Sequence, residues 1–125
     1  MTKPPKVKLR DPEPLQDYYR DRDGCLYSVA RLIDDSKDLP VFEVPVAAID
    51  LSDRIWDESN IYGLAFHVRK CMSADLSCPI LLDWNGALAD GRHRIIKAIA
   101  TGKTTILARR MQWKPEPCRK ADDAQ

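Results

Sequence analysis

The chain has 125 residues, is 44% hydrophobic and carries a formal net charge of +1, which suits one compact domain and leaves too little length for two ordinary ones. No apolar run approaches the roughly 18 residues of a membrane span, and none stands at the N-terminus, so we expect a cytoplasmic protein that makes no membrane contact. The four cysteines form no Cys-x-x-Cys pair. This spacing disfavours a zinc site, and we expect reduced thiols.

Charge is distributed unevenly along the chain. Residues 41–83 contain three Lys/Arg against seven Asp/Glu, whereas residues 84–125 contain nine against four. A local positive site on a nearly neutral protein favours a small anionic ligand over the broad basic face that duplex DNA requires. The second half of the chain is therefore where we expect an anion site.

Three regions are expected along the chain. Residues 1–24 predict a flexible arm, because they are rich in proline and charge and poor in apolar side chains. Leu15, Tyr18 and Tyr19 are its candidate anchors, on the domain or on a second copy. The folded domain is expected over residues 25–112, and a loose tail over residues 113–125.

Apolar spacing predicts the first elements of the domain. A short amphipathic helix is expected over residues 26–33 and a strand over residues 41–46, in which Pro45 favours an edge position or a strand end. A second helix is expected to be capped by Ser59 or Asn60. Its apolar stripe at helical spacing consists of Ile61, Leu64, Ala65, Val68 and Met72. His67 lies one step off the stripe, where a boundary or surface position is favoured over a ligand role.

A hairpin and a helix follow. Residues 79–83 predict a strand, and Asn85-Gly86 predicts a two-residue turn, because both residues tolerate positive φ. The returning strand, Leu88 and Ala89, leads to Asp90, a good N-cap for a helix that stops at Gly102. Residues 104–109 predict a closing strand.

Basic side chains crowd the start of this helix. Arg92, His93 and Arg94 occupy its first turn, where positive charge costs roughly 0.3 to 1 kcal/mol per group against the helix dipole. Local stability does not explain them, whereas a bound phosphate would accept from their side chains and from the free amides. Gly91 would let such a group approach the backbone. The alternative is a solvated helix start that is basic by chance.

The order of elements over residues 41–110 resembles the ParB/sulfiredoxin superfamily, most specifically in the box Asp90-Gly91-Arg92-His93-Arg94. The resemblance implies a single α/β (α+β) domain with a small mixed sheet and flanking helices. It also implies that the box binds nucleotide phosphates, cytidine triphosphate in partition proteins and adenosine triphosphate in sulfiredoxins. Gly91, His93 and Arg94 match the family's box, with Arg92 as an additional clamp and Asp90 as the cap.

The chain departs from both branches of that superfamily. Arg92 stands where sulfiredoxins have their catalytic cysteine, and a guanidinium cannot replace a sulfur nucleophile, so sulfinic-acid reduction is not expected. Only 15 residues follow Arg110, fewer than the helix-turn-helix of a partition protein needs. No paired acidic cluster suggests a two-metal nuclease, and we expect no protein-held metal.

Three functions stay open. The first is a stand-alone nucleotide-binding switch or accessory factor of a bacterial operon or mobile element, taking ATP or CTP with Mg²⁺ held by phosphates and water. Weak nucleotide hydrolysis stays open with it. The second is a DNA-binding or nuclease-type domain, whose phosphate contacts come from a basic patch. That patch would comprise Arg92, Arg94, Lys97, Lys103, Arg109 and Arg110. The third is a protein-interaction module without a ligand, whose N-terminal arm contacts a partner or a second copy.

Overall fold

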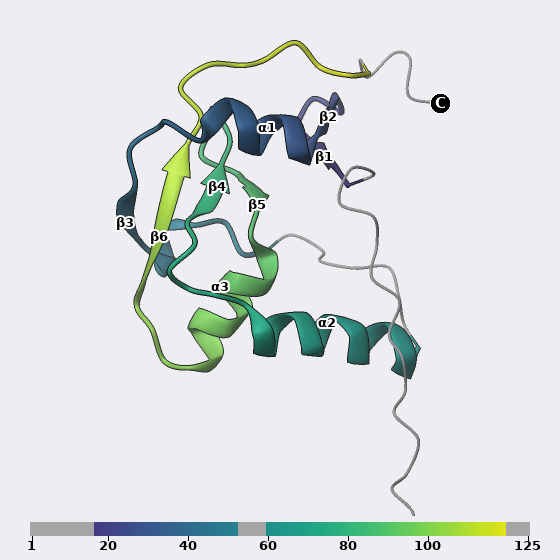
Figure 1. The fold of residues 1–125 in the computed structure, drawn as a ribbon, viewed down its shortest axis with the longest axis vertical. Coiled ribbons are helices and arrows are strands. Elements are labelled where there is room, and N and C mark those ends of the chain that lie inside the picture. The colour runs from purple at the N-terminus through teal and green to yellow at the C-terminus, as the bar shows by residue number, and fades with distance from the viewer. Residues whose placement is uncertain (1–16, 53–59, 120–125) are drawn as a thin grey trace, which may run out of the picture.

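Helices and short strands are interspersed along the described part of the chain (Figure 1). The computed structural model describes residues 17–52 and 60–119. In these residues the strands are β1 (Tyr18–Arg20), β2 (Leu26–Ser28), β3 (Phe42–Pro45), β4 (Ile80–Leu82), β5 (Leu88–Asp90) and β6 (Thr105–Arg110). The helices are α1 (Val29–Ser36), α2 (Ile61–Ser73) and α3 (Arg92–Ala100), with a 3₁₀ turn, η2, at Val46–Ala48.

Four strands form a mixed sheet in the order β3-β6-β4-β5. β6 runs antiparallel to β3 and parallel to β4, and β4 and β5 form an antiparallel hairpin. The expectation of an α/β domain with a small mixed sheet and flanking helices is thereby confirmed. Pro45 ends β3 at the edge of the sheet, where its missing N–H breaks no ladder.

Both faces of the sheet are covered by packed side chains. Successive side chains of the inner strand β4 point to opposite faces, so this strand contributes to both cores. Ile80 and Leu82 pack in a core with α3, and Leu81 packs in a second core with α1 and the β1–β2 hairpin. The first core comprises Val46, Ile49, Ile80, Leu82, Ile95, Ala98, Ile106 and Ala108. The second comprises Tyr19, Tyr27, Val29, Leu32, Leu81 and Met111.

The last residues of the expected arm belong to the folded body. β1 pairs with β2, and Tyr19 is 9% exposed because its hydroxyl donates to the buried carboxylate of Asp83 at 2.7 Å. Asp21 is likewise buried, accepting from the Tyr27 hydroxyl at 3.0 Å. Specific hydrogen bonds therefore order a segment whose composition predicts an arm. Residues 1–16, including Leu15, lie outside the described part of the chain.

Two further boundaries differ from the expectation. The helix predicted over residues 26–33 is divided, because residues 26–28 pair as β2 and the Ser28 hydroxyl caps α1 by accepting from the Arg31 amide. Residues 113–119 of the expected tail return to this strand. There the Leu26 amide donates to the Arg119 carbonyl at 2.8 Å.

The predicted hairpin at Asn85-Gly86 is present, although its turn is not the two-residue type. Only Gly86 has positive φ, and the Gly86 amide closes a four-residue turn on the Asp83 carbonyl at 3.0 Å. The Asp83 carboxylate accepts from the amides of Asn85 and Ala87 at 2.7 and 2.9 Å. Asp83 thus holds the turn and also, through Tyr19, the β1–β2 hairpin.

Candidate functional site at the start of α3

The N-cap of α3 is Gly91, not Asp90 as the sequence suggests. Gly91 has φ 117°, and a Cβ built there would lie 2.5 Å from Cγ2 of Ile80. The group that approaches the glycine backbone is therefore β4 itself. Asp90 is instead the last residue of β5, opposite Leu81, so its carboxylate is free to turn toward the helix.

Arg94 forms a salt bridge with the Asp90 carboxylate. Its Nη2 lies 2.8 Å from Oδ2 of Asp90, and its Nη1 donates to the carbonyls of Cys78, at 3.2 Å, and Pro79. Both terminal nitrogens of the guanidinium thus bind protein acceptors. Arg94 joins the first turn of α3 to the segment before β4, and contact with a phosphate would come in addition to these bonds.

His93 meets His67 of α2. Nε2 of His93 lies 3.0 Å from Nδ1 of His67, and the ring planes differ by only 18°. One nitrogen must donate and the other accept, so the pair holds a single proton between its rings. The two imidazoles thereby connect α2 with the start of α3. His67 is half-buried and lies on the side of α2 that faces α3, whereas its position in the sequence favours a boundary or surface residue.

Basic groups from two helices converge on His93. Burial lowers the pKa of His93, and the nearby His67, Lys70 and Arg92 lower it further, while Asp90 acts in the opposite direction. Asp17 is the second acidic group here, since burial and the charge of Asp90 raise its pKa and Arg92 opposes the shift. The site is therefore mainly cationic, with two carboxylates at its border.

The amino end of α3 adds backbone N–H groups to the site. The first amide to donate within α3 is that of Ile95, which binds the Gly91 carbonyl at 3.0 Å. The amides of Arg92, His93 and Arg94 precede it, and Gly91 has no side chain to cap them. All five residues of the predicted box thus lie at one helix start, though Asp90 and Arg94 are paired with each other.

Sequence reasoning left out Lys70, His67 and Asp17 as members of the site. His67 and Lys70 are three residues apart and so share one face of α2, which is a signal that the sequence does contain. Asp17 lies 73 positions before Asp90 and has no comparable local signal.

Three of the other basic residues proposed for a nucleic-acid patch, Lys97, Arg109 and Arg110, have structural partners. Lys97 donates to the Met72 and Ala74 carbonyls at the end of α2, at 3.2 and 2.7 Å. Arg109 donates to the Leu39 carbonyl, and Arg110 to that of Trp84. These bonds serve three different segments of the fold.

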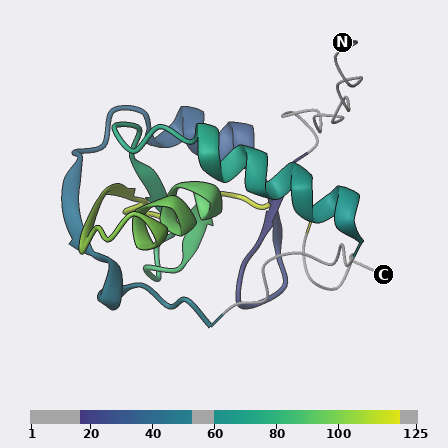
Figure 2. The same ribbon diagram turned by 90° about the horizontal axis from the view of Figure 1, so that it is seen from below.

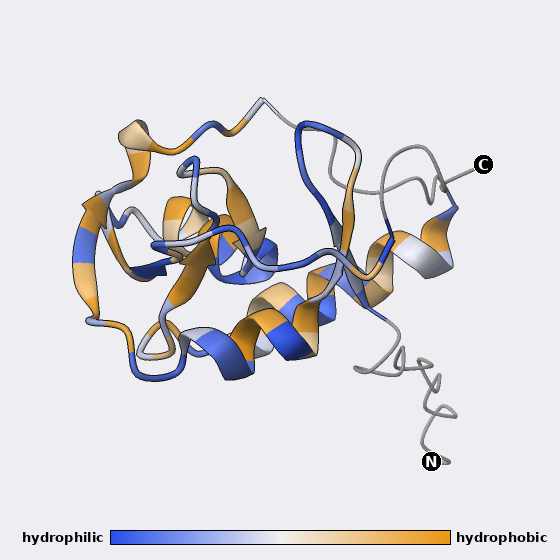
Figure 3. Cartoon of the chain, turned by 90° about the horizontal axis from the view of Figure 1, so that it is seen from above, coloured by the Kyte–Doolittle hydropathy of each residue, from blue (hydrophilic) through white to orange (hydrophobic). Residues whose placement is uncertain are grey.

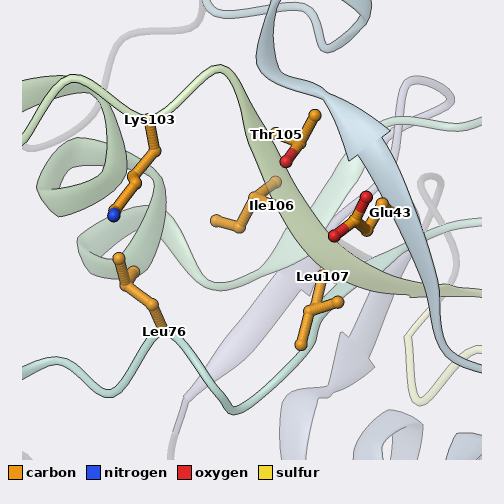
Figure 4. A pocket seen from close by; sticks show the side chains of 6 residues that line it. All are labelled: Glu43, Leu76, Lys103, Thr105, Ile106 and Leu107. Carbon is orange, nitrogen blue, oxygen red and sulfur yellow. The ribbon is translucent and has the colours of Figure 1, made fainter.

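A shallow pocket of about 120 Å³ lies elsewhere, beside β3 and β6 (Figure 4). It is lined by Glu43, Leu76, Lys103, Thr105, Ile106 and Leu107. Organic ligands occupy pockets of about 300 to 1,000 Å³. The pocket is too small for a nucleotide, and no residue of the box lines it.

No protein-family model matches this chain, and neither does a curated protein or a solved structure. Within residues 17–52 and 60–119, no three His, Cys, Asp or Glu side chains come together as a metal site. None of the helices in those ranges has the length and apolar character needed to cross a membrane.

Because Gly91 packs against Ile80, we expect alanine to destabilise the protein more at position 91 than at position 102. Gly91→Ala combines an unfavourable φ with overlap against Ile80, so we expect the free energy of unfolding to fall by more than about 2 kcal/mol. Gly102→Ala is the matched control, since its φ is 79° but nothing lies within 4 Å. It should cost about 1 kcal/mol. Urea unfolding measures both, and equal losses would contradict the proposed contact.

Arg94→Ala tests whether this residue serves the fold. The substitution leaves the half-buried Asp90 carboxylate and two carbonyls without their donor, so we expect a loss of about 2 kcal/mol in the free energy of unfolding. Arg110→Ala, which removes one exposed bond to a carbonyl, should cost less than about 1 kcal/mol. Unchanged stability of Arg94→Ala would show that its bonds are dispensable.

Proposed function

We propose that the chain binds the phosphates of a nucleotide, ATP or CTP, at the start of α3. The observation that carries this proposal is that His93, 3.0 Å from His67 of α2, lies at the amino end of a helix whose cap is a glycine, with Lys70 and Arg92 near enough to lower its pKa. Without a ligand the positive charges of Lys70 and Arg92 disfavour the protonated form of His93, and Arg92 in the first turn opposes the helix dipole. A phosphate would offset both effects and accept from the first-turn amides.

The side chains divide into two roles in this proposal. Arg92 and His93 donate to the phosphate, and Lys70 adds positive charge from α2. Arg94 neutralises Asp90 and positions the first turn, which revises the direct phosphate contact that the box resemblance implies. The Asp17 carboxylate opposes anion binding. Any Mg²⁺ would be held by phosphates and water.

The order of the elements supports this assignment. β3, α2, β4, β5, α3 and β6 follow one another as in the ParB/sulfiredoxin resemblance, and the box lies between β5 and α3. We propose a domain of that type, acting as a switch or accessory factor. DNA binding is the weaker alternative, because Lys97, Arg109 and Arg110 bind carbonyls within the fold.

Calorimetry with ATP, CTP, GTP and UTP, with and without Mg²⁺, tests the proposal. We expect ATP or CTP to bind the wild-type chain, and Arg92→Gln to weaken that binding about tenfold through loss of one charge-assisted contact. Lys103→Gln removes an exposed cation from the separate pocket and should bind as the wild type does. Absence of heat at millimolar nucleotide, or equal weakening by both variants, would overturn the proposal.

The pKa of His93 gives the proposal a pH dependence. Burial and neighbouring cations lower this pKa in the free protein, whereas a bound phosphate would raise it, so binding should take up protons. Affinity should therefore increase as pH falls from about 8 to about 6, because protonated imidazole favours the complex. Calorimetry in buffers of different ionisation enthalpy counts the protons. His93→Gln should take up fewer, and an equal count would exclude His93 as the group protonated.

A further inference from the structure

Helix α2 faces its apolar stripe outward. Its half-buried side consists of Gly63, Phe66, His67, Lys70 and Cys71. The stripe lies on the opposite side, where Ile61 is 88%, Leu64 57%, Val68 48% and Met72 75% exposed. No residue of α2 is buried, although an amphipathic helix ordinarily packs its apolar side on the core. The stripe therefore lacks a partner within the described residues.

Figures 1 and 2 show how α2 lies relative to α3. α2 runs beside α3 and extends past it, so that one end projects from the body (Figures 1 and 2). Apolar positions recur along that projecting end (Figure 3). Contacts with α3 occur on the side of His67, opposite the stripe.

Four residues of the stripe are spaced symmetrically. Ile61, Ala65, Val68 and Met72 follow one another at gaps of four, three and four residues, which read the same in either direction, and Leu64 lies beside them outside this pattern. When two copies of α2 meet antiparallel about a two-fold axis, Ile61 of each lies opposite Met72 of the other. Ala65 likewise lies opposite Val68, so a small side chain faces a larger one. A two-fold interface pairs one patch with itself, and this spacing places apolar side chains opposite one another in it.

Charge favours the antiparallel arrangement. α2 contains Arg69 and Lys70 near its C-terminal end and no acidic residue. A parallel pair would bring the basic ends together and align the helix dipoles, whereas an antiparallel pair separates the charges and opposes the dipoles. A membrane surface suits the face less well. Helices that bind membrane surfaces carry several basic residues beside their apolar face. In α2 the Lys70 ammonium lies 5.6 Å from the Phe66 ring on the half-buried side, so Arg69 is the cation of α2 that lies beside the stripe.

We propose that α2 binds a second copy of this chain, antiparallel, through Ile61, Ala65, Val68 and Met72. A helix of 13 residues is about 20 Å long, so one helix pair buries less than the roughly 1,200 to 2,000 Å² of a stable interface. We therefore expect a weak, reversible dimer.

Sedimentation equilibrium of the full chain from about 5 to 500 μM tests the dimer. The wild type should pass from monomer to dimer, and Val68→Glu should weaken association at least tenfold by placing charge at the centre of the interface. Ile33→Glu on α1 is the control, because Ile33 is 46% exposed and lies on another helix. It should associate as the wild type does. A monomeric wild type, or equal effects of both substitutions, would overturn the proposal.

A mixing experiment tests the orientation. Ala65→Glu and Val68→Lys should each weaken self-association, while an equimolar mixture should associate more strongly than either alone. In the antiparallel pair the introduced acid and base face each other across the axis, whereas in a parallel pair each faces an unchanged residue. Circular dichroism establishes that both variants fold. A mixture no stronger than its components would overturn the antiparallel arrangement.

Discussion

The packing of Gly91 against Ile80 fixes where α3 begins, and the candidate site depends on that position. With a glycine as cap, the helix amides meet no side chain from their own cap residue. Asp90 is the last residue of β5, and its carboxylate binds the Arg94 guanidinium and does not cap the first amides of α3. Arg92 and His93 occupy the first turn of the helix that begins there, where a bound phosphate would also meet the free amides.

The orientation of α2 serves two surfaces. Its half-buried side contributes His67 and Lys70 to the site, which an entirely apolar inner side would not. Because polar groups face α3, the apolar stripe is exposed to solvent and its burial does not stabilise the monomer. A second copy bound to the stripe would bury this apolar surface. The proposed site and the proposed dimer therefore share one helix, with opposite faces assigned to each.

Local patterns in the sequence predict the elements that local forces form. Asn60 caps α2, Pro45 lies on an edge strand, and the Asn85-Gly86 hairpin is present, because capping, a missing donor and turn chemistry act within a few residues. Contacts between distant residues leave no such pattern. Tyr19 and Asp83 are 64 positions apart, and His67 and His93 are 26 apart. For the same reason the sequence predicts the five-residue box, whose members are adjacent, but does not predict that Arg94 binds the carbonyls of Cys78 and Pro79.

Amide chemical shifts offer the most direct measurement of the central claim, that a nucleotide phosphate binds at the start of α3. In a titration of ¹⁵N-labelled protein with ATP and with CTP, the account predicts that the largest shifts occur at the amides of Arg92, His93 and Arg94. Inorganic phosphate at higher concentration should move the same amides. Shifts confined to other residues, such as those of the pocket around Lys103, or no shift at millimolar nucleotide, would contradict it.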